Sequence, residues 1–268
     1  MDWIAVWQSA AMGVVEGITE YLPISSTGHL LLVEKWMGFE FHESFEVVIQ
    51  TGAVLAVVVE YWRRFVRLVP RPGMENRGFS GWNGWLWLAL TTLPACVLGL
   101  AFHDALKEHF FNPRSIAWAL ALGGAAMILL ERLLPKKAAA DGVDAVGWKR
   151  ALGVGIFQCV AMIPGTSRSM CTILGGRLLG LDRKTAAEYS FFAAVPVLVL
   201  AGAYDFYKGL GSLTKADIVP YLVGLAVSYF VAVLAIRFLM RMLARHTLEA
   251  FGWYRLALAA AVWLTLCR

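Results

Sequence analysis

The chain has 268 residues, of which 59% are hydrophobic and only 16% charged, and its mean hydropathy is +0.63. Because a soluble domain has about 25% charged residues, this composition excludes a soluble globular protein. The net charge of +5 does not indicate nucleic-acid binding, since the basic residues gather in a few loops, as they do on the cytoplasmic side of membrane proteins. The four cysteines lack the spacing of a disulfide framework or a zinc site.

Ten apolar segments follow one another along the chain, and six of them approach the roughly 20 residues that cross a bilayer. The other four are shorter or interrupted, and they form two pairs that we interpret as re-entrant helix hairpins. In chain order the segments are the first hairpin (4–22 and 24–37), three spans (45–62, 83–102 and 115–134), the second hairpin (151–163 and 170–181) and three further spans (189–207, 217–240 and 251–267). The sequence therefore predicts an all-α polytopic membrane protein with six spanning helices and two re-entrant hairpins.

The charges of the loops predict the orientation of these segments. The loops 63–82, 131–150 and 241–250 are rich in arginine and lysine, whereas 38–44 has neither. The positive-inside rule places the basic loops in the cytoplasm, so that 38–44 and 103–114 face outside. The first hairpin then enters from outside and the second from the cytoplasm.

This topology gives two halves of opposite orientation, approximately 1–134 and 150–268, within a single transmembrane domain, 1–268. Pro23 with the following Ser25-Ser26-Thr27 is matched, 141 positions later, by Pro164 with the following Thr166-Ser167-Arg168. Inverted repeats with broken helices place a substrate site near the bilayer midplane, where the two halves meet. We therefore expect the two hairpins to share one site.

The first hairpin carries a polar motif, EGITEYLPISSTGH, from Glu16 to His29. Ionisable residues at membrane depth are costly and mark a functional site. Glu16 and Glu20 are four residues apart, so they lie on one face of a helix, which Pro23 ends or bends. The hydroxyl groups that follow, together with free N–H groups at the start of the next helix, make an anion site; they belong to Ser25, Ser26 and Thr27.

The second hairpin carries the motif PGTSRS, residues 164–169, in which Arg168 adds a planar cation suited to phosphate oxygens. One cation with hydroxyls, an imidazole and two carboxylates suits phosphoryl transfer. Simpler roles compete: Arg168 can snorkel to the surface, the serines can merely cap helices, and His29 can be a structural core residue. A shared site is favoured because all of these simpler roles would have to coincide in two short stretches.

Both motifs strongly resemble the signature regions of the undecaprenyl-diphosphatase (bacitracin-resistance) family, and the run FEVVIQTGA at 45–53 is similar to it as well. The resemblance covers nearly the whole chain in length and segment order. It implies a multi-pass enzyme of the bacterial inner membrane that hydrolyses undecaprenyl diphosphate to the monophosphate and phosphate. It also implies recycling of the lipid carrier for peptidoglycan, tolerance of bacitracin, and a divalent cation, Mg²⁺ or Ca²⁺.

The functional residues that the resemblance implies are Glu16, Glu20, Ser25, Ser26, Thr27, His29 and Arg168. Met170 and Cys171 replace the glycine and alanine with which the family usually continues the second motif, a change that bears on the packing of the hairpin and not on the charged chemistry.

The residues leave two mechanisms open. Either Ser26 attacks the terminal phosphorus, or a water activated by a metal does so, and in both cases Glu20 or His29 takes the proton. Glu16 orients Glu20, or the two carboxylates share the metal. Arg168 stabilises the phosphoryl charge, and the substrate-binding residues are expected to be Ser25, Thr27, Thr166, Ser167 and Ser169.

A transporter or flippase of polyprenyl phosphate is the alternative, because inverted repeats around a midplane site are the architecture of alternating access. The two carboxylates argue against it, since they repel a phosphate that is only to be carried. A type-2 phosphatidate phosphatase is disfavoured, because the histidine position of its motif falls on Leu174. The expected partners are the polyprenyl diphosphate and the bilayer, with the site opening towards the periplasm; the sequence leaves a homo-oligomer open.

Overall fold

The computed structural model describes residues 3–38, 43–71, 77–135, 140, 142–209, 214 and 216–267, so the expected outer loop 38–44 lies largely outside the described residues. Regular structure in the described ranges is helical, apart from an isolated β-bridge between Ala140 and Leu181. The helices are α1 (Trp3–Thr19), α2 (Ser26–Met37), α3 (Glu43–Glu60), α4 (Trp62–Leu68), α5 (Gly81–Phe110), α6 (Pro113–Leu133), the short 3₁₀ helix η1 (Val143–Ala145), α7 (Gly147–Val160), α8 (Arg168–Leu178), α9 (Arg183–Gly209), α10 (Ile218–Leu243) and α11 (Glu249–Leu266).

All ten predicted segments correspond to helices, and the two predicted breaks occur between α1 and α2 and between α7 and α8. In the described part of the chain, four helices are long and apolar enough to cross a membrane: α5, α6, α9 and α10. A fifth span results if α3 and α4 are counted together, although they meet at an angle of 81°. The structure thus supports four or five spans, and α11 is outside that set because Glu249 and Arg255 lower the hydropathy of its first half.

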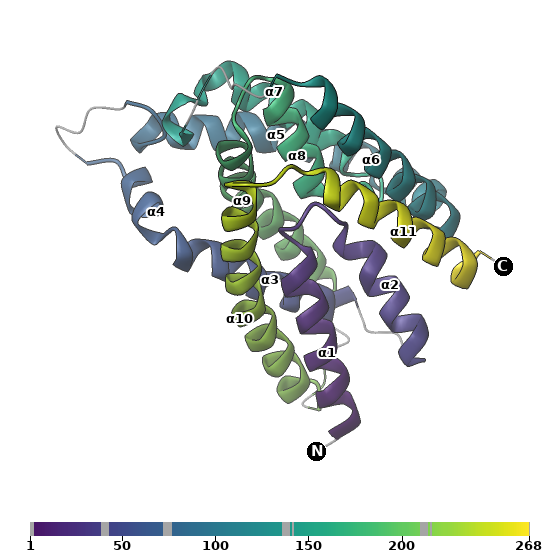
Figure 1. The fold of residues 1–268 in the computed structure, drawn as a ribbon. Coiled ribbons are helices and arrows are strands. Elements are labelled where there is room, and N and C mark those ends of the chain that lie inside the picture. Colours follow the sequence, from purple (N-terminus) through teal and green to yellow (C-terminus); the bar gives the residue numbers. More distant parts are fainter. Residues whose placement is uncertain are drawn as a thin grey trace.

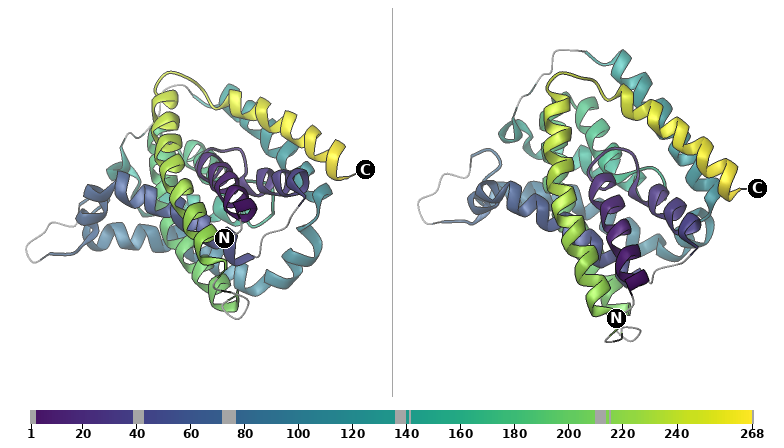
Figure 2. Two further views of the ribbon diagram at one scale, coloured as in Figure 1. Left: turned by 90° about the horizontal axis from the view of Figure 1, so that it is seen from below. Right: turned by 60° about the horizontal axis from the view of Figure 1, so that its bottom comes forward.

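The helices pack mainly in pairs whose members are far apart in sequence. Figure 1 shows α10 running beside α1, and α6 beside α11, and both pairs are in contact. The same pairs remain together in the two other views of Figure 2. On the other side of the molecule α5 packs against α7 and α9, while α3 contacts both α9 and α10.

Small residues let two of these pairs approach closely, as is typical of membrane helices. A Cβ atom at Gly13 of α1 would lie only 2.6 Å from the carbonyl oxygen of Gly224 in α10. A Cβ atom at Gly155 of α7 would lie 2.7 Å from the carbonyl oxygen of Leu90 in α5. The broken helices α1 and α7 are therefore each held against a long helix by backbone contact.

Both breaks end in a serine with a left-handed backbone. Ser25 has φ 74° and Ser167 has φ 72°, a conformation that costs free energy for a residue with a side chain. The Ser25 hydroxyl accepts a hydrogen bond from the Gly28 N–H, and the Ser167 hydroxyl accepts one from the Met170 N–H. Each serine is the N-cap of the helix that follows, so the chain reverses in the same way at both breaks.

The two N-cap serines give a sequence offset between the two motifs that differs from the predicted one. The equivalent serines are 142 positions apart, one more than the 141 expected from the prolines, because the second loop (161–166) has one residue more than the first (20–24). Ser26 and Arg168 are consequently equivalent first residues of α2 and α8. The two loops place different chemistry, a hydroxyl and a guanidinium, at the same backbone position.

Candidate active site

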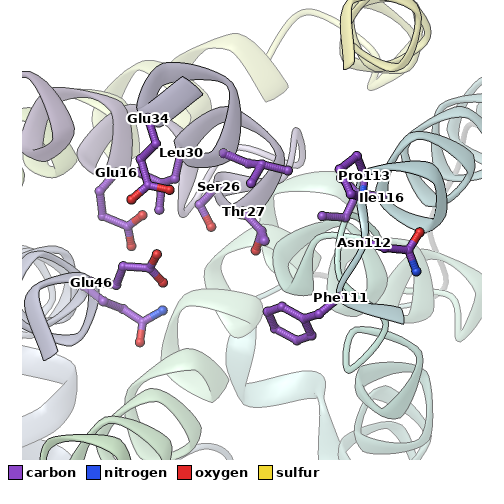
Figure 3. Close-up of a pocket in the computed structure, with 12 residues that line it drawn as sticks. Glu16, Ser26, Thr27, Leu30, Glu34, Glu46, Phe111, Asn112, Pro113 and Ile116 are labelled. Atoms are coloured by element: carbon purple, nitrogen blue, oxygen red, sulfur yellow. The ribbon is translucent and has the colours of Figure 1, made fainter. Parts of the chain in front are cut away.

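A pocket of about 210 Å³ lies between α2, α3 and the connection from α5 to α6 (Figure 3). The two breaks of the hairpins are adjacent in space, but only the first contributes side chains to the pocket wall. The lining residues are Glu16, Ser26, Thr27, Leu30, Leu31, Glu34, Glu46, Gln50, Phe111, Asn112, Pro113 and Ile116. Of the predicted site residues, Glu16, Ser26 and Thr27 thus face the pocket directly.

Ser26 and Arg168 meet at the carboxylate of Glu20. The Ser26 hydroxyl donates a hydrogen bond of 2.8 Å to Oε2 of Glu20. The Arg168 guanidinium pairs with Oε1 of the same carboxylate, with Nη2 at 3.3 Å. Glu20 therefore joins the two hairpins, and it places a proton acceptor beside the hydroxyl that faces the pocket, as activation of a serine nucleophile requires.

Arg168 is fixed within the protein. Its side chain is 11% exposed, its Nη1 donates to the carbonyl oxygen of Ser190 at 3.0 Å, and its Cζ lies 5.8 Å from the centre of the Tyr21 ring. The competing possibility that this arginine snorkels to the surface is wrong, because both ends of its guanidinium are bound inside.

Glu16 lies one helical turn before Glu20, and its environment is different. The residue is 1% exposed, and within the described part of the chain neither carboxylate oxygen has a hydrogen-bond partner. An unpartnered buried carboxylate is costly, and a cation in the pocket would compensate for it. Figure 3 shows Glu16 and Glu46 pointing towards the same part of the pocket, where Gln50 also contributes to the wall.

The described residues hold no group of three or more His, Cys, Asp or Glu side chains that could bind a metal ion by itself. Mg²⁺ is nevertheless often held by one or two carboxylates together with water and substrate phosphates. Glu16 fits such a partial site, with Glu46 and Gln50 nearby in the wall. Glu20 fits it less well, since both of its oxygens already bind Ser26 and Arg168.

His29 is near the first break but is bonded elsewhere. Its Nδ1 is 2.7 Å from the carbonyl oxygen of Ser25, and its Nε2 is 2.8 Å from the hydroxyl of Tyr254, whose ring stacks on the imidazole. A carbonyl can only accept, so Nδ1 carries the proton and Nε2 accepts from Tyr254. In this arrangement Glu20, and not His29, is placed to take the Ser26 proton.

The hydroxyl groups of the second motif hold the loop and do not line the pocket. Thr166 donates to the carbonyl oxygen of Ile163 at 2.7 Å. Ser169 donates to the carbonyl oxygen of Leu22 at 2.9 Å, and Ser167 lies 3.0 Å from the Ser169 hydroxyl. These contacts fasten the second loop to itself and to the first loop, which positions Arg168 for its contact with Glu20.

Arg255 of α11 is a buried link between the two loops that the sequence interpretation missed. It is fully buried, and its guanidinium donates to the carbonyl oxygens of Gly165 at 2.9 Å and Ala119 at 3.1 Å, with that of Pro23 at 3.5 Å. Pro23 and Gly165 belong to the two loops, so one cation binds both breaks. The available signal was an arginine inside the predicted span 251–267, where an ionisable residue indicates function.

The other residues of the pocket wall are less clearly indicated by the sequence as members of the site. Gln50 lines the pocket, whereas Thr51 is exposed and donates to the Val47 carbonyl oxygen of its own helix. Phe111 and Asn112 come from the connection between α5 and α6, where no motif or periodicity marks them.

The fold and this site define a class of protein: a helical membrane protein with a serine, carboxylate and arginine arranged for chemistry on an anionic group. The chain belongs to the family described as Bacitracin resistance protein BacA, whose model matches residues 9–261.

Three curated relatives carry the name undecaprenyl-diphosphatase. The protein of Maridesulfovibrio salexigens is 49% identical over 96% of this chain and 97% of its own length. That of Desulfovibrio desulfuricans is 47% identical over 94% of this chain and 95% of its own. That of Acidovorax ebreus is 44% identical over 99% of this chain and 96% of its own.

Proposed function

We propose that this chain is an undecaprenyl-diphosphatase, which hydrolyses undecaprenyl diphosphate to undecaprenyl phosphate and inorganic phosphate. The reaction returns the lipid carrier to cell-wall synthesis and confers tolerance of bacitracin. Family membership and the names of relatives at 44–49% identity support the activity. The observation that carries the chemistry is the 2.8 Å hydrogen bond from Ser26, on the pocket wall, to Glu20, which also pairs with Arg168.

In the proposed mechanism the Ser26 oxygen attacks the terminal phosphorus while its proton passes to Glu20. The bond between that phosphorus and the bridging oxygen breaks, and undecaprenyl phosphate leaves. Glu20 passes its proton to the leaving phosphate and becomes a carboxylate again. Water then attacks the phosphoserine, Glu20 takes a proton from that water and gives it to the Ser26 oxygen, and phosphate is released with Ser26 restored. This route needs only the donor and acceptor already in contact.

Arg168 has a defined part in this sequence. Once Glu20 has taken the proton it is neutral, and its attraction for Arg168 weakens. The guanidinium is then available to the charge that develops on the phosphoryl oxygens, where a planar donor stabilises the transition state. The contact between Arg168 and Glu20 at 3.3 Å couples proton transfer to this stabilisation.

We assign a divalent cation, Mg²⁺ or Ca²⁺, to Glu16, with Glu46 and Gln50 as further residues of its surroundings. When bound, the cation neutralises part of the charge of the diphosphate. Support comes from the two unpartnered oxygens of buried Glu16. This proposal narrows the predicted pair Glu16 and Glu20 to Glu16, because Glu20 has other partners.

The proposed architecture is six spans and two re-entrant hairpins in inverted repeats of approximately 1–134 and 150–268. The helix contacts support it. The helices of the first half are α1, α2, α3, α5 and α6, and their counterparts in the second half are, in the same order, α7, α8, α9, α10 and α11. When each helix is replaced by its counterpart, the contact of α1 with α10 corresponds to the contact of α7 with α5. In the same way, the contact of α3 with α10 corresponds to the contact of α9 with α5. The contact of α2 with α11 likewise becomes that of α8 with α6. In this arrangement α11 is the counterpart of α6 and is counted as the sixth span.

We further propose that the protein lies in the bacterial inner membrane with its pocket open to the periplasm. The pocket wall includes residues of the predicted outer loop 103–114, namely Phe111, Asn112 and Pro113. Glu34 and Glu46 of the wall flank the predicted outer loop 38–44. A reporter fused after Arg268 tests the orientation: a periplasmic signal supports it, and a cytoplasmic signal contradicts it.

Transport of polyprenyl phosphate, the alternative function, gains no support from relatives that are named for hydrolysis. The function is tested by measuring phosphate release from undecaprenyl diphosphate by the purified, detergent-solubilised protein with Mg²⁺ present. Wild type should release phosphate, Ser26→Ala should not, and Thr51→Ala, whose hydroxyl bonds only its own helix, should behave as wild type. A folded wild type without activity would contradict the proposal.

A further inference from the structure

The pocket has a polar side and an apolar side, with the reactive hydroxyl between them. In Figure 3 the carboxylates of Glu16, Glu34 and Glu46 gather on one side of Ser26. Phe111, Pro113 and Ile116 lie on the other side. A substrate with phosphate at Ser26 would therefore direct one end towards the carboxylates and the other towards apolar side chains.

The size of the pocket limits what can enter it. Its volume is about 210 Å³, whereas pockets that enclose a drug-sized ligand measure roughly 300–1,000 Å³. A C55 chain cannot fit, so the diphosphate and at most the first carbons of the lipid occupy the pocket, while the rest of the chain stays in the bilayer. Selection of the lipid by this site must act close to the phosphate.

Phe111 is placed to make that selection. The residue is 58% exposed although it lines the pocket, and Figure 3 shows its ring at the edge of the cavity, across from Glu16 and Glu34. The next residue fixes its position: the Asn112 side chain accepts a hydrogen bond from the Ser115 N–H and donates one to the His109 carbonyl oxygen, both at 2.9 Å. These bonds fix the backbone on both sides of the residue that presents its ring to the pocket.

We propose that Phe111, with Leu31 and Ile116, binds the first isoprenoid unit of the substrate, next to the carbon that carries the diphosphate. This inference rests on the proposed phosphatase function and names the specificity element of its site. The protein then selects for an isoprenoid group at the phosphate, and it discriminates little between chain lengths beyond the first unit.

The test compares wild type, Phe111→Ala and Phe111→Leu in phosphate release from undecaprenyl diphosphate and from the C15 compound farnesyl diphosphate. Phe111→Ala should lose about tenfold in kcat/KM with both substrates, mainly through KM, because an apolar contact is removed. Phe111→Leu should recover most of the loss. Phe102→Ala is the matched control, since Phe102 is an equally exposed phenylalanine of α5 that does not line the pocket.

Inorganic diphosphate, used as a competitive inhibitor, separates tail binding from a structural effect. Its inhibition constant should be the same for wild type and Phe111→Ala, because it has no tail. An inhibition constant that rises as much as KM, or a kcat/KM that Phe111→Ala leaves unchanged, would overturn the inference while wild-type phosphate release still supported the phosphatase. Absence of wild-type release would instead count against the proposed function itself.

Discussion

The two broken-helix loops, 20–24 and 161–166, have the same backbone design and different contents. Each ends in a serine with positive φ that caps the next helix, Ser25 in one and Ser167 in the other. Beyond the first cap lies Ser26, which faces the pocket, and beyond the second lies Arg168, which reaches across to Glu20. The remaining hydroxyls of the second motif bind backbone carbonyls of the two loops.

This difference indicates that the site has one reactive hairpin and one supporting hairpin. A repeated backbone turn brings the two loops together, and among the described residues only the first hairpin lines the pocket with its side chains. The second contributes through Arg168 and through its hydrogen bonds to the first. Substitutions in the two loops should therefore have unequal effects, and their ranking tests the division.

The largest effect is expected for Ser26→Ala, which removes the attacking oxygen. We expect kcat for undecaprenyl diphosphate to fall by at least about a thousandfold, because the nucleophile cannot be replaced by its neighbours. Phosphate release from detergent-solubilised protein measures it. A fall of only a few fold would favour attack by water and would remove the main distinction between the two loops.

Arg168→Ala should come next, with a loss of about 100- to 1,000-fold in kcat, the range for removal of one group that stabilises developing charge. Arg168→Lys should restore only a small part, because a lysine cannot bind Glu20 and the Ser190 carbonyl oxygen at once. Full activity of the lysine variant would show that a point charge suffices at this position.

Arg255→Met should weaken both loops together, since three backbone carbonyl oxygens lose their donor. Each buried group left without a partner costs about 1–3 kcal/mol, so the melting temperature in detergent should fall. Arg255→Lys should fold better than Arg255→Met, and both variants should have a raised KM, because neither a thioether nor a single ammonium group can hold both loops as the guanidinium does. A variant with unchanged melting temperature and unchanged KM would contradict the bridging role.

The smallest effect is expected for Ser169→Ala, which removes one hydrogen bond between the loops, to the carbonyl oxygen of Leu22. A loss of about 1 kcal/mol in stability and a few fold in kcat/KM should follow. Thermal unfolding and phosphate release, both compared with Ser26→Ala, measure it. An effect on kcat as large as that of Ser26→Ala would place this serine in the reacting group and abolish the distinction.

The sequence predicted the helices and their two breaks well, because hydrophobic runs and the prolines at 23 and 164 mark them directly. It also identified the residues around Glu20, since ionisable groups in apolar segments stand out. The partners of those residues could not be read from the chain. The contact of His29 with Tyr254 joins residues 225 positions apart, and the contacts of Arg255 with Pro23 and Gly165 join residues 232 and 90 positions apart.

The pocket shows the same limit. Phe111 and Asn112 have no motif around them, and they join the site only because α5 and α6 bring their connection close to α2. The expected role of the second motif in substrate binding was drawn from residue types alone. The structure gives these hydroxyls partners within the protein, and contact with substrate stays a prediction for Thr166, Ser167 and Ser169.

The most direct test of the shared site is a double-mutant cycle on kcat/KM for undecaprenyl diphosphate, with Glu20→Ala, Arg168→Ala and the combined variant, each verified as folded by its melting temperature. If the two hairpins act as one unit through the Glu20–Arg168 contact, the double variant should be about as active as the worse single variant. Losses that multiply in the double variant would mean that the two hairpins act independently, which contradicts a single site.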